Sequence, residues 1–383
     1  MKTVNSLIVV CIGLMLTGCT IVTGNSEASY PGDPDLGITL PDTRSAYLGL
    51  ATPNYADAPA QLPQIYITIG KHAEIIAHHL DNGVPWQEAL DGKYLYHPYV
   101  EEDLSARLRY RQAGQKLVLS LSPLAPDHIN LAGHWGENPH MALDAQWSNK
   151  PFNHPDVVNA YVNYTRDLIN RFHPDYLSYA SDVTELAKTD RVKFNTLLIF
   201  LNQVYHRLKL EHPRLPIFIT VPLDDAQDFN LNRWAIDMIN PYTDYLAISS
   251  YPSSDPAIMG QGGQVPPHWF VKLRDLAGKK PIAINGTGFN ADAVPTDRGV
   301  LPGNERSQAD YLHFLLTEAD KLNAVFVIWS PVIDLREPPT IDPQDLQADV
   351  RYQRLRSGGL FALSMKPRLA LRVWDKWLEL PPR

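Results

Sequence analysis

The chain has 383 residues, of which 44% are hydrophobic and 20% charged, so a wholly disordered or fibrous protein is excluded. The length suits one large α/β barrel or two ordinary domains. Its 34 Lys and Arg residues stand against 42 Asp and Glu residues, and no window carries the dense basic stripe that a phosphate backbone requires. Nucleic acid is therefore not expected as a partner.

A short apolar run near the N-terminus is typical of an export signal. The run extends from Leu7 to Leu16 after Lys2 and is too short to span a bilayer. The letters LTGC at positions 16–19 resemble the bacterial lipobox, in which the cysteine becomes the lipid-modified N-terminus. We therefore expect residues 1–18 to be a lipoprotein signal peptide and Cys19 to carry the lipid.

The residue after the lipidated cysteine is Thr20, which by resemblance to lipoproteins favours the outer membrane over the inner one. An exported protein, lipid-anchored in the bacterial cell envelope, is the expectation. Residues 19–43 are rich in Gly, Ser, Pro and Asp without an apolar period, which indicates a tether. The chain has only two cysteines, and Cys11 lies in the signal, so neither a disulfide nor a cysteine nucleophile is expected.

From residue 44 to residue 383, short apolar segments alternate with longer segments of helical period. This alternation predicts βα units with a parallel sheet. The predicted strands are Ala46–Leu50, Glu74–His79, Lys116–Leu121, Asp175–Ala180, Pro216–Val221, Asp244–Ser250, Pro281–Asn285 and Ala324–Ser330. The predicted helices are Ala60–Lys71, Glu101–Ala113, Pro155–Phe172, Arg191–Glu211, Asn230–Ile239, Pro267–Leu276, Glu305–Leu322 and Pro367–Leu378.

Eight strands, each followed by a helix, predict an α/β fold of the (β/α)8 TIM-barrel type. An open doubly wound sheet is the alternative, but no Gly-rich phosphate loop follows the first strand, so no nucleotide cofactor is expected. No group of His, Asp and Glu shows a recognised ligand spacing, and no metal is expected either.

Aromatic rings, acids and amides recur where the predicted strands end, which is where TIM barrels place their chemistry. Sugars are bound by such side chains, because their C–H faces stack on flat rings and carboxylates bond their hydroxyls. His78 and His79 point to opposite sides of a strand, so at most one of them faces the mouth, the end of the barrel where the strands finish. The expected saccharide-binding residues are His79, Asp81, Trp86, Trp135, Asp224, Tyr251, Trp329 and Asp334.

Nine stretches of the chain resemble, in order and spacing, the clan A glycoside hydrolases near the galactanase-like group. They are YLGLATPNYADAP, AHHLDNGVPWQEAL, LVLSLSPL, PDYLSYASDVTEL, LPIFITVPLD, DYLAISSYP, PIAINGTGF, LNAVFVIWS and KPRLALRVWDKWL. The resemblance implies a retaining pair of glutamates, an acid/base after the fourth strand and a nucleophile after the seventh. A retaining pair stands about 5 to 5.5 Å apart.

This sequence departs from the family pattern at both catalytic positions. The resemblance assigns the acid/base position to Asp182, which is one methylene shorter than Glu, and the nucleophile position to Gly286. Glycine has no side chain to attack the anomeric carbon, so a covalent glycosyl-enzyme is not expected.

Three functions remain open from the sequence. One is a catalytically degenerate barrel that binds a poly- or oligosaccharide, with aromatic rings lining a cleft over Asp182 and a gap at Gly286. Another is an active hydrolase that uses substrate assistance or a direct water attack, with Asp182 or Glu185 as acid and Asp224, Asp225 or Asp334 as base. Glu185 is otherwise a solvated carboxylate in a first helical turn. The remaining reading is a scaffold that binds another envelope protein through its outer surface.

Overall fold

Eight parallel strands close into a barrel in the order β1-β10-β7-β6-β5-β4-β3-β2. The computed structural model describes residues 36–53, 60–223, 229–254, 258, 264–296, 299–335, 353 and 355–383. The strands are β1 (Tyr47–Ala51), β2 (Ile75–Leu80), β3 (Lys116–Leu121), β4 (Tyr176–Ser181), β5 (Ile217–Pro222), β6 (Leu246–Ser250), β7 (Ile282–Thr287) and β10 (Phe326–Trp329). The pairing of β1 with β10 closes the ring, so the predicted TIM barrel is confirmed and the open sheet is wrong.

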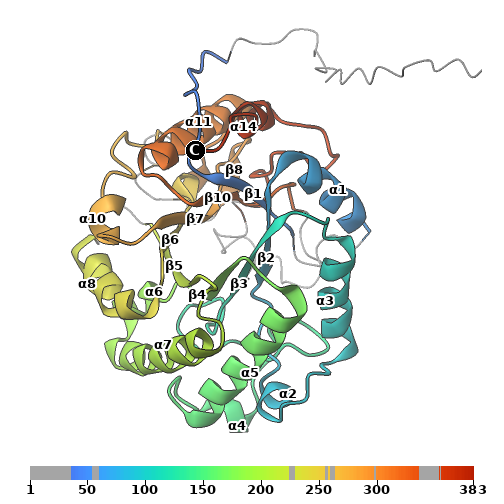
Figure 1. The fold of residues 1–383 in the computed structure, drawn as a ribbon, viewed down its shortest axis with the longest axis vertical. Coiled ribbons are helices and arrows are strands. Elements are labelled where there is room, and N and C mark those ends of the chain that lie inside the picture. The colour runs from blue at the N-terminus through green and yellow to red at the C-terminus, as the bar shows by residue number, and fades with distance from the viewer. Residues whose placement is uncertain are drawn as a thin grey trace, which may run out of the picture. The chain divides into compact units, whose positions relative to one another are not determined.

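Helices surround this ring of strands (Figure 1). They are α1 (Leu62–His72), α2 (Trp86–Leu90), α3 (Pro98–Tyr110), α4 (Ala145–Ser148), α5 (Pro155–Phe172), α6 (Thr184–Thr189), α7 (Arg191–Glu211), α8 (Phe229–Ile239), α10 (Leu273–Ala277), α11 (Glu305–Lys321) and α14 (Leu369–Leu378). Short 3-10 turns occupy Asn240–Tyr242 (η3) and Pro252–Ser254 (η4), and β8 (Val294–Thr296) pairs with β9 (Gly299–Leu301) as a small hairpin.

Two predicted helices needed the largest corrections at their ends. The helix expected from Glu101 begins at Pro98, because the ring of His97 accepts a hydrogen bond from the backbone N–H of Tyr99 and Pro98 fits the first turn. The helix expected over Pro267–Leu276 is helical only over Leu273–Ala277.

The part of the barrel interior that lies farther from the mouth is apolar. One buried cluster draws side chains from all eight barrel strands, and it consists of Ala51, Ile75, Ala77, Val118, Tyr176, Phe218, Ala247, Ala283, Phe326 and Ile328. Because side chains alternate along a strand, this cluster fixes which residues face inward nearer the carboxyl ends. On β2, Ile75 and Ala77 face inward, so His79 does as well. His78 faces the helices, where its Nε2 lies 3.0 Å from the Tyr66 hydroxyl of α1.

Candidate functional site

A polar layer lies above the apolar cluster and crosses the barrel. The side-chain amide of Asn285 on β7 donates to Ser120 Oγ on β3 at 3.0 Å and to Thr220 Oγ1 on β5 at 2.9 Å. The hydroxyls of Thr220 and Ser178 on β4 lie 2.8 Å apart. Asn285 is only 2% exposed, and its Oδ1 is a buried oxygen without a hydrogen-bond partner. An unpaired buried acceptor is costly, so this oxygen lacks the compensating hydrogen bond that the other polar groups of the layer have.

A second set of polar side chains lies at the carboxyl ends of the strands, where solvent reaches it. These residues are all partly exposed, and they are His79, Ser122, Asp182, Ser249, Tyr251 and Ser330. They come from, or directly follow, five of the eight barrel strands. The barrel mouth is therefore polar and accessible, as the site of a hydrophilic ligand requires.

Asp182 is held at this mouth by the residues of neighbouring strands. It follows β4, and its backbone N–H donates to the carbonyl of Thr220 at 2.9 Å. Its φ of 57° lies in the left-handed region, which Asp adopts more easily than most residues and which is enriched at functional sites. The carboxylate accepts from Ser249 Oγ at 3.4 Å and lies 3.7 Å from His128 Nδ1, with 31% of the side chain exposed.

His79 faces the same mouth from β2. Burial lowers the pKa of His79, and the charges of Asp81 and Asp182 act against that shift. Its Nε2 is buried without a hydrogen-bond partner, although the residue is partly exposed. Asp81 is exposed just beyond β2. The two carboxylates therefore act on one neutral imidazole.

Glu185 lies on a helix, and not at the end of a barrel strand as Asp182 does. It lies in the first turn of α6, where its carboxylate forms an ion pair with Lys188 at 2.9 Å. Its backbone N–H donates to the carbonyl of Asp182 at 3.1 Å. Glu185 therefore closes the turn that begins at Asp182, and the ammonium of Lys188 lies beside its carboxylate.

The Tyr251 hydroxyl lies close to the Gly286 position, where the sequence predicts a gap. A register shift between β6 and β7 pairs Ile248 with Ile284 but Ser249 with Gly286. Such bulges re-aim side chains, and here both Asn285 and Gly286 turn toward the barrel interior. A Cβ on Gly286 would lie 3.1 Å from the hydroxyl of Tyr251 and 3.8 Å from Ser249 Cβ.

Three of the four aromatic rings expected to line a cleft are instead fully buried. Trp86, Trp135 and Trp329 are each 0% exposed. Trp86 stacks on Trp147 and donates its indole N–H to the carbonyl of Ala132. These rings have no free face on which a sugar could stack, so only Tyr251 keeps the predicted place at the mouth.

Trp329 points away from the mouth because of strand alternation. Phe326 and Ile328 of β10 face the interior, so Trp329 turns to the helix layer, where its ring lies 6.2 Å from that of Tyr311 on α11. Its indole N–H donates to the carbonyl of Gly358 at 2.9 Å.

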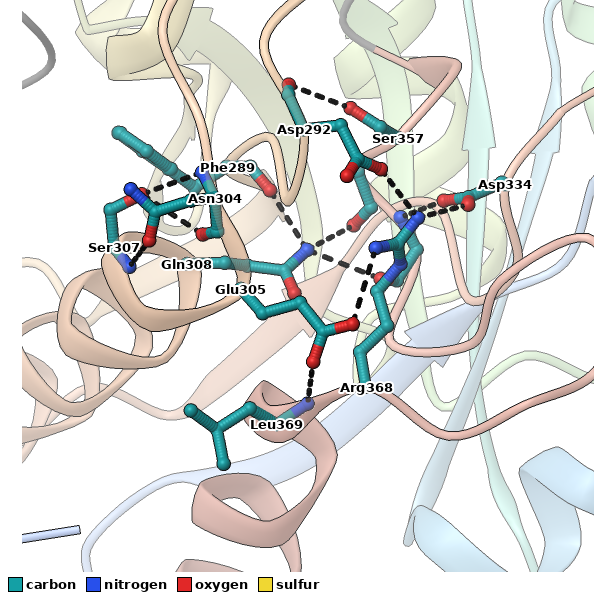
Figure 2. A network of polar contacts seen from close by, with 12 residues as sticks. Phe289, Asp292, Asn304, Glu305, Ser307, Gln308, Asp334, Ser357, Arg368 and Leu369 are labelled. Atoms are coloured by element: carbon teal, nitrogen blue, oxygen red, sulfur yellow. Dashed lines mark hydrogen bonds and ion pairs between the residues drawn. The ribbon is translucent and has the colours of Figure 1, made fainter. Parts of the chain in front are cut away.

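Asp334, which the sequence predicted to bind the saccharide, is instead held in a buried ion pair. Its carboxylate accepts from Arg368 at 2.6 Å and from the backbone N–H of Gly359 at 2.9 Å, and both charged side chains are 8% exposed. Arg368 also pairs with Asp292 at 2.9 Å, and Glu305 lies 3.8 Å from it (Figure 2). Asp334 is therefore a structural ion-pair partner, which leaves it unsuited to bind a sugar or act as a base.

The same network holds the segment around Gly358 against the barrel. The buried amide of Gln308 on α11 donates to the carbonyls of Phe289, Gly358 and Gly359 (Figure 2). This segment covers the indole N–H of Trp329, which accounts for the burial of that ring.

Several predicted residues lie outside the described part of the chain. They are Cys19, Asp224 and Asp225. Within the described residues, no three or more His, Cys, Asp or Glu side chains gather closely enough to hold a metal ion. A separate search of those residues found no helix with the length and apolarity needed to cross a bilayer.

Comparison with solved structures shows the barrel of glycoside hydrolases. No family model matches the sequence, and no curated protein matches it. The fold is similar to the Ignisphaera aggregans GH53 catalytic domain, with a TM-score of 0.56 and 14% identity over 90% of this chain and 98% of that one. It is also similar to the β-glycosidase BGL167, with a TM-score of 0.57 and 12% identity over 90% and 98% of the two chains.

Larger enzymes share the barrel as one part of their length. The exo-β-1,4-mannosidase Op5Man5 from Opitutaceae bacterium strain TAV5 has a TM-score of 0.56 and 12% identity over 88% of this chain and 59% of that one. The chain spans 49% of a Ruminococcus gnavus β-glucuronidase, at a TM-score of 0.51 and 12% identity. At these identities the similarity shows a glycoside hydrolase-like TIM barrel and leaves the activity to be argued from the site.

Proposed function

We propose that this protein is an exported, lipid-anchored barrel that binds a poly- or oligosaccharide at its mouth and forms no glycosyl-enzyme. The observation that carries the proposal is the pairing of a polar, solvent-accessible mouth with a glycine at the place where the family resemblance puts the nucleophile. The mouth offers the carboxylate of Asp182 and the hydroxyls of Ser249 and Tyr251, all on partly exposed residues. Sugar hydroxyls are both donors and acceptors and fit such a set.

The signal peptide and lipobox support the location of the protein. A lipid on Cys19 would hold it in the cell envelope, with the outer membrane favoured, and residues 20–43 would separate the barrel from the bilayer. A protein partner in the envelope is compatible with this location, and no described contact favours a particular one.

A weak inverting hydrolysis is the second candidate, and one observation favours it. Asp81 directly follows β2 and Asp182 directly follows β4, so both carboxylates stand at strand ends of the mouth, and the charges of both act on His79. An inverting pair needs about 6.5 to 9.5 Å between its carboxyl groups to admit a water. Release of reducing ends by the wild type, lost in both Asp81→Asn and Asp182→Asn, would favour this candidate over binding alone.

Calorimetric titration of the full-length lipoprotein in detergent tests the binding function. With a panel of neutral oligosaccharides of several linkages, we expect at least one to bind. Asp182→Asn should then weaken binding about 10- to 100-fold, because hydrogen bonds to a charged group are worth about 1.5 to 3 kcal/mol.

The matched control is Asp310→Asn on α11, which removes an exposed carboxylate that pairs with Arg306. It should leave the affinity unchanged. A folded wild-type protein that bound none of the panel would refute the proposed function, and equal affinities for wild type and Asp182→Asn would remove Asp182 from the site.

A further inference from the structure

We propose that the buried ion pair of Asp103 and Arg107 on α3 positions the saccharide-binding mouth by fixing the chain where it leaves β1 and β2. The inference rests on the proposed function and deepens it, since it names two residues that act on the bound saccharide through others. Asp103 is 0% and Arg107 2% exposed, so neither can contact a ligand. They are positioning residues, and the groups that they hold in place are His79 and Asp81 at the end of β2.

The pair lies on the buried face of α3. Asp103 and Arg107 are one helical turn apart, and Arg107 Nε donates to Asp103 Oδ1 at 2.6 Å. The cost of taking two charges out of water is offset only where further hydrogen bonds satisfy their remaining polar atoms. Two of these further bonds go to residues at the carboxyl ends of barrel strands.

One bond fixes the end of β1, and the other fixes the end of β2. Nη1 of Arg107 donates to the hydroxyl of Thr52, the residue after β1, at 3.2 Å. The side-chain amide of Asn82, two residues after β2, donates to Asp103 Oδ2 at 3.2 Å. Thr52 and Asn82 are 6% and 3% exposed, and a hydrogen bond to a charged group is stronger away from water. One ion pair therefore joins two neighbouring strand ends.

The loop after β3 is joined to the same place through the backbone of Asn82. The N–H of His140 donates to the carbonyl of Asn82 at 2.8 Å. The N–H of Val84 donates to the carbonyl of Gly133 at 3.0 Å. Gly83 has a φ of 113°, and a Cβ there would lie 2.5 Å from the carbonyl oxygen of Gly133, so this close approach requires a glycine. The segments after β2 and β3 thus form one unit, which α3 holds through Asn82.

The residues that this anchor places at the mouth are Asp81 and His79. Asp81 is exposed and precedes Asn82 in the chain, and His79 faces the mouth from β2. Burial lowers the pKa of His79, and the positive charge of Arg107 lowers it further, against the charges of Asp81 and Asp182. A neutral imidazole both donates and accepts hydrogen bonds, as sugar hydroxyls do. The ion pair therefore acts on the place of these groups and on the charge of the imidazole.

Replacing both charged residues with apolar ones separates positioning from stability. Arg107→Met alone leaves a buried carboxylate and should lower the Tm strongly, whereas Asp103→Leu combined with Arg107→Met leaves no buried charge and should restore much of the Tm. The double variant still lacks both strand-end anchors. In calorimetric titration with the neutral oligosaccharide that the wild type binds most tightly, we expect about 10-fold weaker binding. The matched control is Glu102→Leu with Arg109→Met, an exposed pair on the same helix, which should bind as the wild type does.

Asn82→Ala is the second variant, and it keeps the ion pair. It removes the anchor of β2 alone and should weaken binding about 5-fold. Wild-type affinity in a folded double variant would overturn the proposal. Where the double variant shows no cooperative unfolding transition, wild-type affinity in Asn82→Ala would overturn it.

NMR titration of the histidine rings gives a readout that a purely structural role would not move. The double variant removes the positive charge that acts on His79, so the pKa of His79 should rise, and it should stay unchanged in the control pair. An unchanged pKa of His79 in the folded double variant would contradict the proposal. A wild type that bound no oligosaccharide would overturn the binding function and this inference with it, whereas equal binding by the wild type and the double variant would overturn the positioning alone.

Discussion

Replacing Arg368 with methionine should lower the free energy of unfolding by about 3 to 5 kcal/mol, because it leaves the carboxylate of Asp334 buried without its charged partner. Asp334 and Arg368 are each 8% exposed and 2.6 Å apart, whereas Asp292 and Glu305 are mostly exposed and can turn to water. Equilibrium unfolding in urea at pH 7 measures the loss. The matched control is Arg109→Met, which removes an exposed pair with Glu102 and should cost about 1 kcal/mol or less.

The pH dependence of this loss identifies its cause. Burial raises the pKa of Asp334, and the hydrogen bond and charge of Arg368 oppose that shift. Without the guanidinium the pKa of the folded state rises further above its unfolded value. The penalty is therefore largest above that raised pKa and shrinks as the pH falls and the carboxyl becomes protonated. A deficit of equal size at pH 4 and pH 7 would show that lost packing, and no buried charge, causes it.

Replacing Trp329 with alanine should lower the free energy of unfolding by about 3 to 5 kcal/mol, because a fully buried ring leaves a cavity. The change also removes the hydrogen bond to the carbonyl of Gly358. Trp234→Ala on α8 is the matched control; its ring is 37% exposed, and the expected loss is about 1 kcal/mol.

Saccharide titration of Trp329→Phe separates a packing role from a stacking role. Since the ring faces the helix layer, we expect reduced stability with unchanged affinity. A clear loss of affinity in a folded Trp329→Phe protein would mean that this ring contacts the sugar, and the inward and outward assignment of β10 would be wrong.

The fold was predictable because each barrel strand is a short apolar run followed by a helical period. The predicted bounds of β3, α5 and α7 agree with the structure to the residue. Most ends of the other helices and strands differ from the prediction by one to three residues. Hydrogen bonds at the ends of an element, such as the one His97 accepts, depend on local geometry, and the apolar period of the sequence does not determine that geometry. The pairing of β1 with β10, which closes the barrel, was predictable from the count of eight strands.

Two residues of the site were predictable from the sequence, one from the alternation of side chains along a strand and one from the end of a predicted strand. His79 could be assigned to one of two faces, and Asp182 could be assigned to a strand end. The burial of Trp329 could not be foreseen, because it depends on the strand register and on a distant segment at Gly358. Asn285 and Ser249 were missed, although both lie within the stretches that resemble the family and each stands two residues after an inward-facing alanine, Ala283 or Ala247.

The most direct test of saccharide binding without a covalent intermediate is intact-protein mass spectrometry after saturation with a bound oligosaccharide and with its 2-deoxy-2-fluoro analogue carrying a good leaving group. With Gly286 beneath the Tyr251 hydroxyl, the proposed function predicts an unchanged protein mass at full occupancy of the site. A mass increase of one glycosyl unit, mapped to a side chain at the barrel mouth, would contradict it.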